Sequence, residues 1–170
     1  MWHDYFSNAK VFGLDINPAD HLDNERISTM VIDQSSPEGL QKFVDQSGVD
    51  GFDIILDDGS HRPDHQQISF SYLFKFLKKG GLYFIEDISA NGLGDQQHGR
   101  HSCHDVLNTR TVLKSFMKFG EFATPNALID SEYLASNVEM IRFHCPARKE
   151  NIQHVKYHYN SEKLCVIRKL

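Results

Sequence analysis

The most informative part of this sequence is residues 52–88, which read FDIILDDGSHRPDHQQISFSYLFKFLKKGGLYFIEDI. Short apolar runs stand near both ends of the stretch, at residues 52–56 and 82–85. Between them, apolar residues after Pro63 recur every three or four positions, which is the period of a helix that packs on one face. A strand, a helix and a second strand in this order are typical of a parallel β-α-β unit.

The same alternation extends to both sides of this unit. Apolar runs at residues 11–14 and 29–32 precede it, and a helix is expected between Ser36, with a proline in its first turn, and Gly48. Two later runs, at residues 138–143 and 164–167, have no evident helix between them and are expected to pair antiparallel. We therefore predict one α/β domain over residues 1–170, with a doubly wound, mostly parallel sheet.

The ends of two helices and one loop can also be predicted. The helix after Pro63 is expected to continue to Lys78 and Lys79, with residues 80–81 as its left-handed glycine cap. Residues 88–104 are rich in Gly, Asn, Gln and His, and we expect a long loop there. After this loop, an N-cap at Asp105 is expected to start a helix that carries Val106, Leu113, Phe116 and Met117.

Composition narrows the class of protein. The net charge is −5 and no basic run is longer than Lys78-Lys79, so a nucleic-acid partner is not expected. The three cysteines, at 103, 145 and 165, form no C-x-x-C pair, which favours a reducing cytoplasm. No apolar run approaches the roughly 20 residues of a membrane span, so a membrane partner is not expected either.

Acidic residues follow each of the first four predicted strands. In open parallel sheets, ligands bind beyond the carboxyl ends of the strands. One such acid would be explained by a turn or a helix cap, but clustered carboxylates raise one another's pKa unless hydroxyl donors or a cation compensate. The predicted site therefore contains Asp15, Asp33, Asp57, Asp58, Glu86 and Asp87.

The residue types divide this site into a cofactor part and a metal part. Asp15 is suited to the two hydroxyls of a ribose, and Asp33 with Gln34 is suited to adenine; Asp57 is assigned to the same part. Neither a Walker sequence nor G-x-G-x-x-G is present, which favours a cofactor without phosphates.

The metal part consists of hard oxygen ligands. Asp58, Glu86 and Asp87 are the ligand type that Mg²⁺ or Mn²⁺ prefers. His61, three residues beyond Asp58, is predicted as the general base for a hydroxyl at the metal, although a solvated histidine at a helix start is the alternative. A transition-metal site is a weaker alternative, at His98, His101, Cys103 and His104.

These motifs resemble a known family. The sequences DDGSH (57–61) and GGLYFIED (80–87), preceded by VFGLDINP (11–18) and IDQSSPEGL (32–40), are similar to the macrocin and mycinamicin type sugar O-methyltransferases of macrolide biosynthesis. The resemblance covers about residues 2–88. It implies a class I, Rossmann-like methyltransferase fold, S-adenosylmethionine as methyl donor, and magnesium (or manganese) at the acceptor hydroxyl.

The family roles fall on the residues already selected. The resemblance implies that Asp58, Glu86 and Asp87 bind metal, that His61 is the base, and that Asp15, Asp33 and Gln34 contact the cofactor. The expected activity is methylation of a hydroxyl on a small molecule, by family default a sugar or a glycosylated natural product. The alternatives are a non-catalytic, methyltransferase-like fragment and a metal-dependent hydroxylase or hydrolase.

The resemblance also implies that one strand is missing. Family members have a strand and a glycine-rich turn before the part that matches residues 2–6, and this strand is central in a doubly wound sheet. We expect the runs at 11–14 and 52–56 to lack a shared neighbour, which a preceding segment or another subunit, as in a homo-oligomer, would supply. An isolated chain is expected to bind S-adenosylmethionine weakly or not at all.

Overall fold

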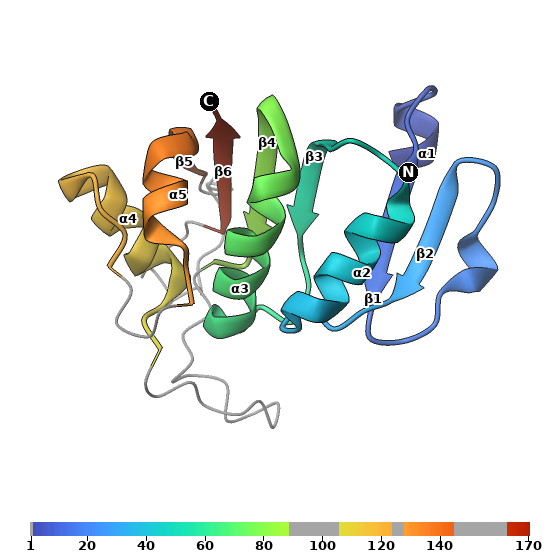
Figure 1. Ribbon diagram of the computed structural model, residues 1–170, viewed down its shortest axis with the longest axis horizontal. Helices are drawn as coiled ribbons and strands as arrows, with labels where there is room; N and C mark the ends of the chain where they lie inside the picture. The colour runs from blue at the N-terminus through green and yellow to red at the C-terminus, as the bar shows by residue number, and fades with distance from the viewer. Residues whose placement is uncertain (1, 89–105, 124–127, 145–162) are drawn as a thin grey trace, which may run out of the picture.

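The computed structural model describes residues 2–88, 106–123, 128–144 and 163–170. Helices and strands alternate through the first half of the chain, and two strands follow the last helix (Figure 1). The elements are α1 (Trp2–Tyr5), β1 (Val11–Asp15), η1 (Asp20–Leu22), β2 (Ile27–Val31), α2 (Pro37–Ser47), β3 (Phe52–Asp57), α3 (Pro63–Leu73), η2 (Phe74–Phe76), β4 (Leu77–Glu86), α4 (Thr109–Phe119), α5 (Ser131–Asn137), β5 (Val138–His144) and β6 (Leu164–Lys169).

The strands form two sheets, one of four strands in the order β3-β4-β6-β5 and one that contains β1 and β2. β1 is parallel to β2 and β3 is parallel to β4, whereas β6 is antiparallel to both β4 and β5. Helices α2, α3 and α5 lie on one side of the strands (Figure 1). The predicted α/β class and the predicted antiparallel pairing of the last two strands are confirmed.

The sheet is interrupted between β1 and β3. Within the described ranges, β1 is hydrogen-bonded only to β2 and β3 only to β4. The two sheets meet instead through side chains, because Phe43 of α2 stacks on Phe52 of β3 and meets Phe12 of β1 edge-on. We call Phe12, Phe43 and Phe52 the aromatic bridge. The interruption is what a doubly wound sheet without its central strand would show.

The main core lies between the four-stranded sheet and the helices. Phe70 of α3 is fully buried and meets the rings of Phe74 and Tyr83 at centroid distances of 5.3 and 5.2 Å. Side chains alternate between the faces of a strand, and Ile54 and Leu56 of β3 are exposed on the face opposite the core. Helix α2 has the predicted ends, with the Ser36 hydroxyl accepting from the Gly39 amide and Gly48 in the left-handed conformation.

The predicted C-terminal end of the helix after Pro63 is wrong. The helix after Pro63 ends at Leu73, because the buried Leu77 already pairs with Phe52 as the first residue of β4. Lys78 and Lys79 are therefore strand residues. Gly80, with φ of 75°, lies in an irregularity of β4 where the register with β3 shifts, and it caps no helix.

The helix that was expected after Asp105 begins later. α4 starts at Thr109, and the Asn108 side chain caps it by accepting from the Arg110 amide at 2.9 Å. Val106 precedes the helix, and Met117 is exposed rather than packed in the core. Most of the expected loop at 88–104, Asp105 and the His98–His104 metal alternative lie outside the described residues. In the described part of the chain, no helix has the length and apolar character to cross a membrane.

Candidate functional site

The acidic residues lie at the carboxyl ends of the parallel strands. Asp15 ends β1, Asp33 follows β2 by one residue, and β3 and β4 end with an acid and are followed by another. The arrows of β1, β2 and β3 point to the same edge (Figure 1). Because the sheet is interrupted, this edge has two parts, one beyond β1 and β2 and the other beyond β3 and β4.

The second part contains a group of potential metal ligands. One ligand atom from each of Asp58, His61 and Asp87 lies within 4.8 Å of the others. His61 Nε2 is 3.1 Å from Asp58 Oδ1, and His61 Nδ1 is 3.7 Å from Asp87 Oδ2. The two carboxylate side chains are 54% and 41% exposed, so a cation from solution can reach both. We call these three residues the Asp58–His61–Asp87 group.

Two members of this group have unusual backbone conformations. His61 has φ of 59° and Asp87 has φ of 44°. Among the described residues, these are the only non-glycine residues with positive φ. Such conformations cost about 1 to 3 kcal/mol each and persist only where the surroundings hold them. The fold therefore stabilises the turns that bring these side chains together.

Glu86 was predicted as a ligand but lies outside this group. Burial raises the pKa of its carboxyl, and the negative charges of Asp58 and Asp87 raise it further, while His61 lowers it. Glu86 thus lies in the electric field of the same carboxylates. A cationic side chain at the site, that of Lys163, was missed. Its Nζ is 3.0 Å from Asp87 Oδ1, and its place 76 residues further along the chain left no local signal in the sequence.

The predicted cofactor residues Asp15 and Asp33 are exposed at the other part of the edge. Asp15 Oδ1 accepts from the Asn17 amide at 2.8 Å, and Asp33 Oδ1 accepts from the amide and hydroxyl of Ser35 at 2.8 and 2.7 Å. The hydroxyl bond, followed by the amide bond, lowers the pKa of Asp33. Its carboxylate is therefore ionised at neutral pH and suited to accept further hydrogen bonds.

Gln34 and Asp57, also predicted for the cofactor, bond to each other. Gln34 Nε2 donates to Asp57 Oδ1 at 3.1 Å, and Gln34 Oε1 accepts from the Ser60 amide at 2.7 Å. Asp57 is buried, which raises the pKa of its carboxyl, and it accepts a short hydrogen bond from the Ser69 hydroxyl. Their contact with a cofactor remains a prediction.

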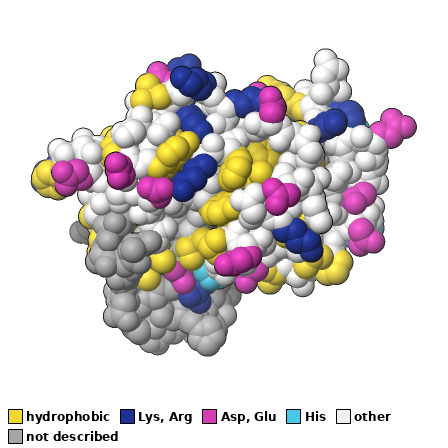
Figure 2. All heavy atoms as spheres, viewed as in Figure 1, with side chains coloured by type: hydrophobic (Ala, Val, Ile, Leu, Met, Phe, Trp, Pro, Cys, Tyr) yellow, Lys and Arg dark blue, Asp and Glu magenta, His cyan; other side chains and the backbone are white. Residues whose placement is uncertain are grey.

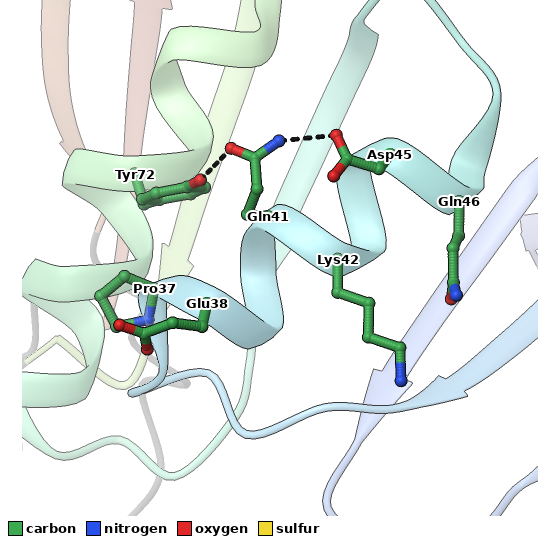
Figure 3. Close-up of a pocket in the computed structure, with 7 residues that line it drawn as sticks. All are labelled: Pro37, Glu38, Gln41, Lys42, Asp45, Gln46 and Tyr72. Atoms are coloured by element: carbon green, nitrogen blue, oxygen red, sulfur yellow. Dashed lines mark hydrogen bonds between the residues drawn. The ribbon is translucent and has the colours of Figure 1, made fainter.

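A surface groove between α2 and α3 contains none of the predicted site residues (Figure 3). Within it the Tyr72 hydroxyl donates to Gln41, whose amide donates to Asp45 at 2.7 Å. Acidic and basic side chains are interspersed over this face of the molecule (Figure 2). The groove is lined by Pro37, Glu38, Gln41, Lys42, Asp45, Gln46 and Tyr72.

Sequence comparison relates the chain to parts of longer sugar O-methyltransferases. It is 42% identical over 88 residues to demethylmacrocin O-methyltransferase of Streptomyces fradiae, which is 52% of this chain and 22% of the relative. It is also 42% identical over 88 residues to mycinamicin VI 2''-O-methyltransferase of Micromonospora griseorubida, again 52% of this chain and 22% of the relative. L-olivosyl-oleandolide 3-O-methyltransferase of Streptomyces antibioticus is 30% identical over 142 residues, which is 81% of this chain and 36% of the relative. No family model matches the chain.

Solved structures of the MycE methyltransferase from the mycinamycin biosynthetic pathway share the fold. The complex with Mg and SAH matches with a TM-score of 0.70 at 27% identity, over 99% of this chain and 39% of that one. The complex that also contains mycinamycin VI matches with a TM-score of 0.67 at 25% identity. The resemblance to this group of class I methyltransferases and the Rossmann-like fold are confirmed, while the chain spans less than two fifths of the length of these relatives.

Proposed function

We propose that this chain is part of a metal-dependent, S-adenosylmethionine-dependent O-methyltransferase that acts on a hydroxyl of a sugar or glycosylated small molecule. The Asp58–His61–Asp87 group carries this proposal, because it joins two carboxylates and an imidazole within 4.8 Å at neighbouring strand ends. The fold supports it, since the MycE methyltransferase has the same fold and was solved with Mg and SAH.

The residues at this edge fit a divalent cation. Asp58 and Asp87 offer exposed oxygen ligands, and Glu86 adds a third carboxyl whose pKa is raised by burial and by the negative charges of Asp58 and Asp87. We assign all three to the metal. When bound, magnesium would supply positive charge that makes the acceptor hydroxyl more acidic, and S-adenosylmethionine would supply the methyl group.

His61 is assigned the proton transfer. Its imidazole lies beside both carboxylates of the group, where it can take the proton of a hydroxyl oriented at the same edge.

We assign Asp15 and Asp33 to S-adenosylmethionine. Both carboxylates are exposed beyond β1 and β2, and an ionised Asp33 can accept from an amino group. Gln34 and Asp57 lie next to this part of the site, with polar atoms turned toward protein groups. A sugar hydroxyl as acceptor follows the names of the relatives, which give demethylmacrocin, mycinamicin VI and L-olivosyl-oleandolide as their substrates.

Metal titration tests the proposal on the chain as it stands. Asp58→Ala and Glu86→Ala should abolish Mn²⁺ binding measured by calorimetry, whereas Glu25→Ala removes an exposed carboxylate elsewhere and should leave it unchanged. Unchanged affinity in both site variants would remove the metal from the proposal. Titration of a longer form of the protein with S-adenosylmethionine, with and without Mg²⁺, separates a methyltransferase from a metal-dependent hydroxylase or hydrolase.

Turnover tests the role of His61. In a longer form of the protein that methylates its acceptor, His61→Ala should lower turnover roughly a hundredfold to ten-thousandfold and leave cofactor affinity unchanged. An equal loss of cofactor binding would make His61 a structural residue. A long form that binds both cofactor and metal without turnover would favour the non-catalytic alternative.

A further inference from the structure

The turn after β3 carries both Asp58 and His61, and a side chain from another strand end holds it. The backbone amide of Ser60, between these two residues, donates to Gln34 Oε1 at 2.7 Å. Gln34 follows β2, so it belongs to the two-stranded sheet, whereas the turn belongs to the four-stranded one. One amide side chain therefore connects the two parts of the edge.

Asp57 holds the other end of this amide. Its Oδ1 accepts from Gln34 Nε2 at 3.1 Å and from the Gly59 amide at 3.4 Å, and its Oδ2 accepts from the Ser69 hydroxyl. A backbone amide can only donate a hydrogen bond, so the oxygen of Gln34 faces Ser60 and its NH₂ end faces Asp57. With 7% of its surface exposed and both oxygens bonded within the protein, Asp57 acts on neighbouring residues rather than on a ligand.

Gly59 provides the space for this arrangement. A Cβ at position 59 would stand 1.9 Å from Gln34 Oε1 and 2.8 Å from Gln34 Cδ. Because hydrogen bonds at both ends hold the Gln34 amide, it cannot move aside without losing them. The glycine of the DDGSH motif is thus explained by the close approach of a side chain.

We propose that Gln34 and Asp57 are positioning residues that hold the turn bearing Asp58 and His61 in the form required at the metal site. The inference rests on the proposed function and deepens it. His61 adopts a left-handed φ of 59°, which its surroundings must stabilise, and the bond from Ser60 to Gln34 immediately precedes it. In this role Gln34 stabilises the metal part of the edge and does not bind adenine.

Gln34→Met, made in the full 170-residue chain, tests this role, since it keeps the length of the side chain and removes both polar ends. The Ser60 amide should lose protection from hydrogen exchange, and the resonances of residues 59–61 should shift. The Kd for Mn²⁺ should rise about tenfold to a hundredfold, as when residues that orient metal ligands are removed. Gln46→Met, an exposed glutamine on α2, is the matched control and should change none of these quantities (Figure 3).

A double-mutant cycle tests the role of Gly59 independently. Gly59→Ala should displace the Gln34 amide and reproduce the loss of Ser60 protection. In a Gln34→Ala background the same substitution meets no amide, so it should add little further effect. Additive effects of the two substitutions would contradict the proposed contact.

The outcomes separate this inference from the proposed function. If Gln34→Met leaves Ser60 protection and Mn²⁺ affinity of the 170-residue chain unchanged but weakens S-adenosylmethionine binding in a longer form of the protein, Gln34 serves the cofactor and the inference is overturned. If the unmodified chain binds no Mn²⁺, the metal site fails. The resonances of Ser60 and His61 then still decide whether Gln34 positions the turn, because unchanged resonances overturn that role and shifted ones uphold it.

Discussion

The aromatic bridge is expected to carry most of the connection between the two sheets, and Phe43→Ala tests it. The Phe43 ring is buried, stacks on Phe52 with centroids 5.3 Å apart and an interplanar angle of 16°, and meets Phe12 edge-on at 5.9 Å. Of the three ring contacts in the aromatic bridge, truncation to alanine leaves the direct one of Phe12 with Phe52. The variant therefore removes a ring of α2 that contacts both sheets.

The expected loss is large compared with the stability of a domain. A buried Phe→Ala substitution costs about 3 to 5 kcal/mol, of which two aromatic pairs at about 0.5 to 1.5 kcal/mol each would account for a substantial part. A whole domain has only about 5 to 15 kcal/mol of stability. Two strands alone are marginal in water, and among the described residues β1 and β2 pair with no other strand. The loss should therefore fall on β1, β2 and α2.

Amide hydrogen exchange measures this distribution residue by residue. In Phe43→Ala, the amides of β1, β2 and α2 should exchange faster, while those of β4 and β6 should keep most of their protection. Phe119→Ala, at a ring that is 68% exposed on α4, is the control and should stay within about 0.5 kcal/mol of the parent. Equal loss across all strands, or a total loss below about 1 kcal/mol, would refute the idea that this ring joins the sheets.

Two further predictions concern charges at the strand ends. Lys163→Met should tighten Mn²⁺ binding, because it removes a cation that competes for Asp87. An ion pair this exposed is worth at most about 1 kcal/mol, so the affinity for Mn²⁺ should rise by no more than about fivefold. Weaker binding of Mn²⁺ in the variant would contradict this prediction. Burial raises the pKa of the Asp57 carboxyl above its ordinary 3.8. The stability that the protonated carboxyl contributes to the folded protein is therefore fully present below pH 3.8, and it is lost as the pH rises through the pKa of the folded state. In urea titrations from pH 4 to 7, Asp57→Asn should therefore gain stability relative to the parent as the pH rises, and a constant difference would show that Asp57 does not titrate in this range.

Local patterns in the sequence were sufficient to locate the strands and to predict both ends of one helix. The six apolar runs correspond to β1–β6, and Ser36 and Gly48 bound α2, because alternation, capping and left-handed glycine are properties of a few adjacent residues. The grouping of acids at one edge also followed from local order, since parallel strands present their carboxyl ends together. The family resemblance added the expectation of an interrupted sheet, and the separation of β1 from β3 agrees with it.

Features that join distant residues required the tertiary structure. The helix after Pro63 ends at Leu73 because Leu77 pairs with Phe52, a contact that outweighs helical periodicity. Lys163 reaches Asp87 across 76 positions, and Gln34 reaches Ser60 across 26. No pattern within one segment encodes such pairs, because the chain brings them together only when β2, β3, β4 and β6 have taken their places. For the same reason, only the folded arrangement shows that Gln34 is the side chain that explains Gly59.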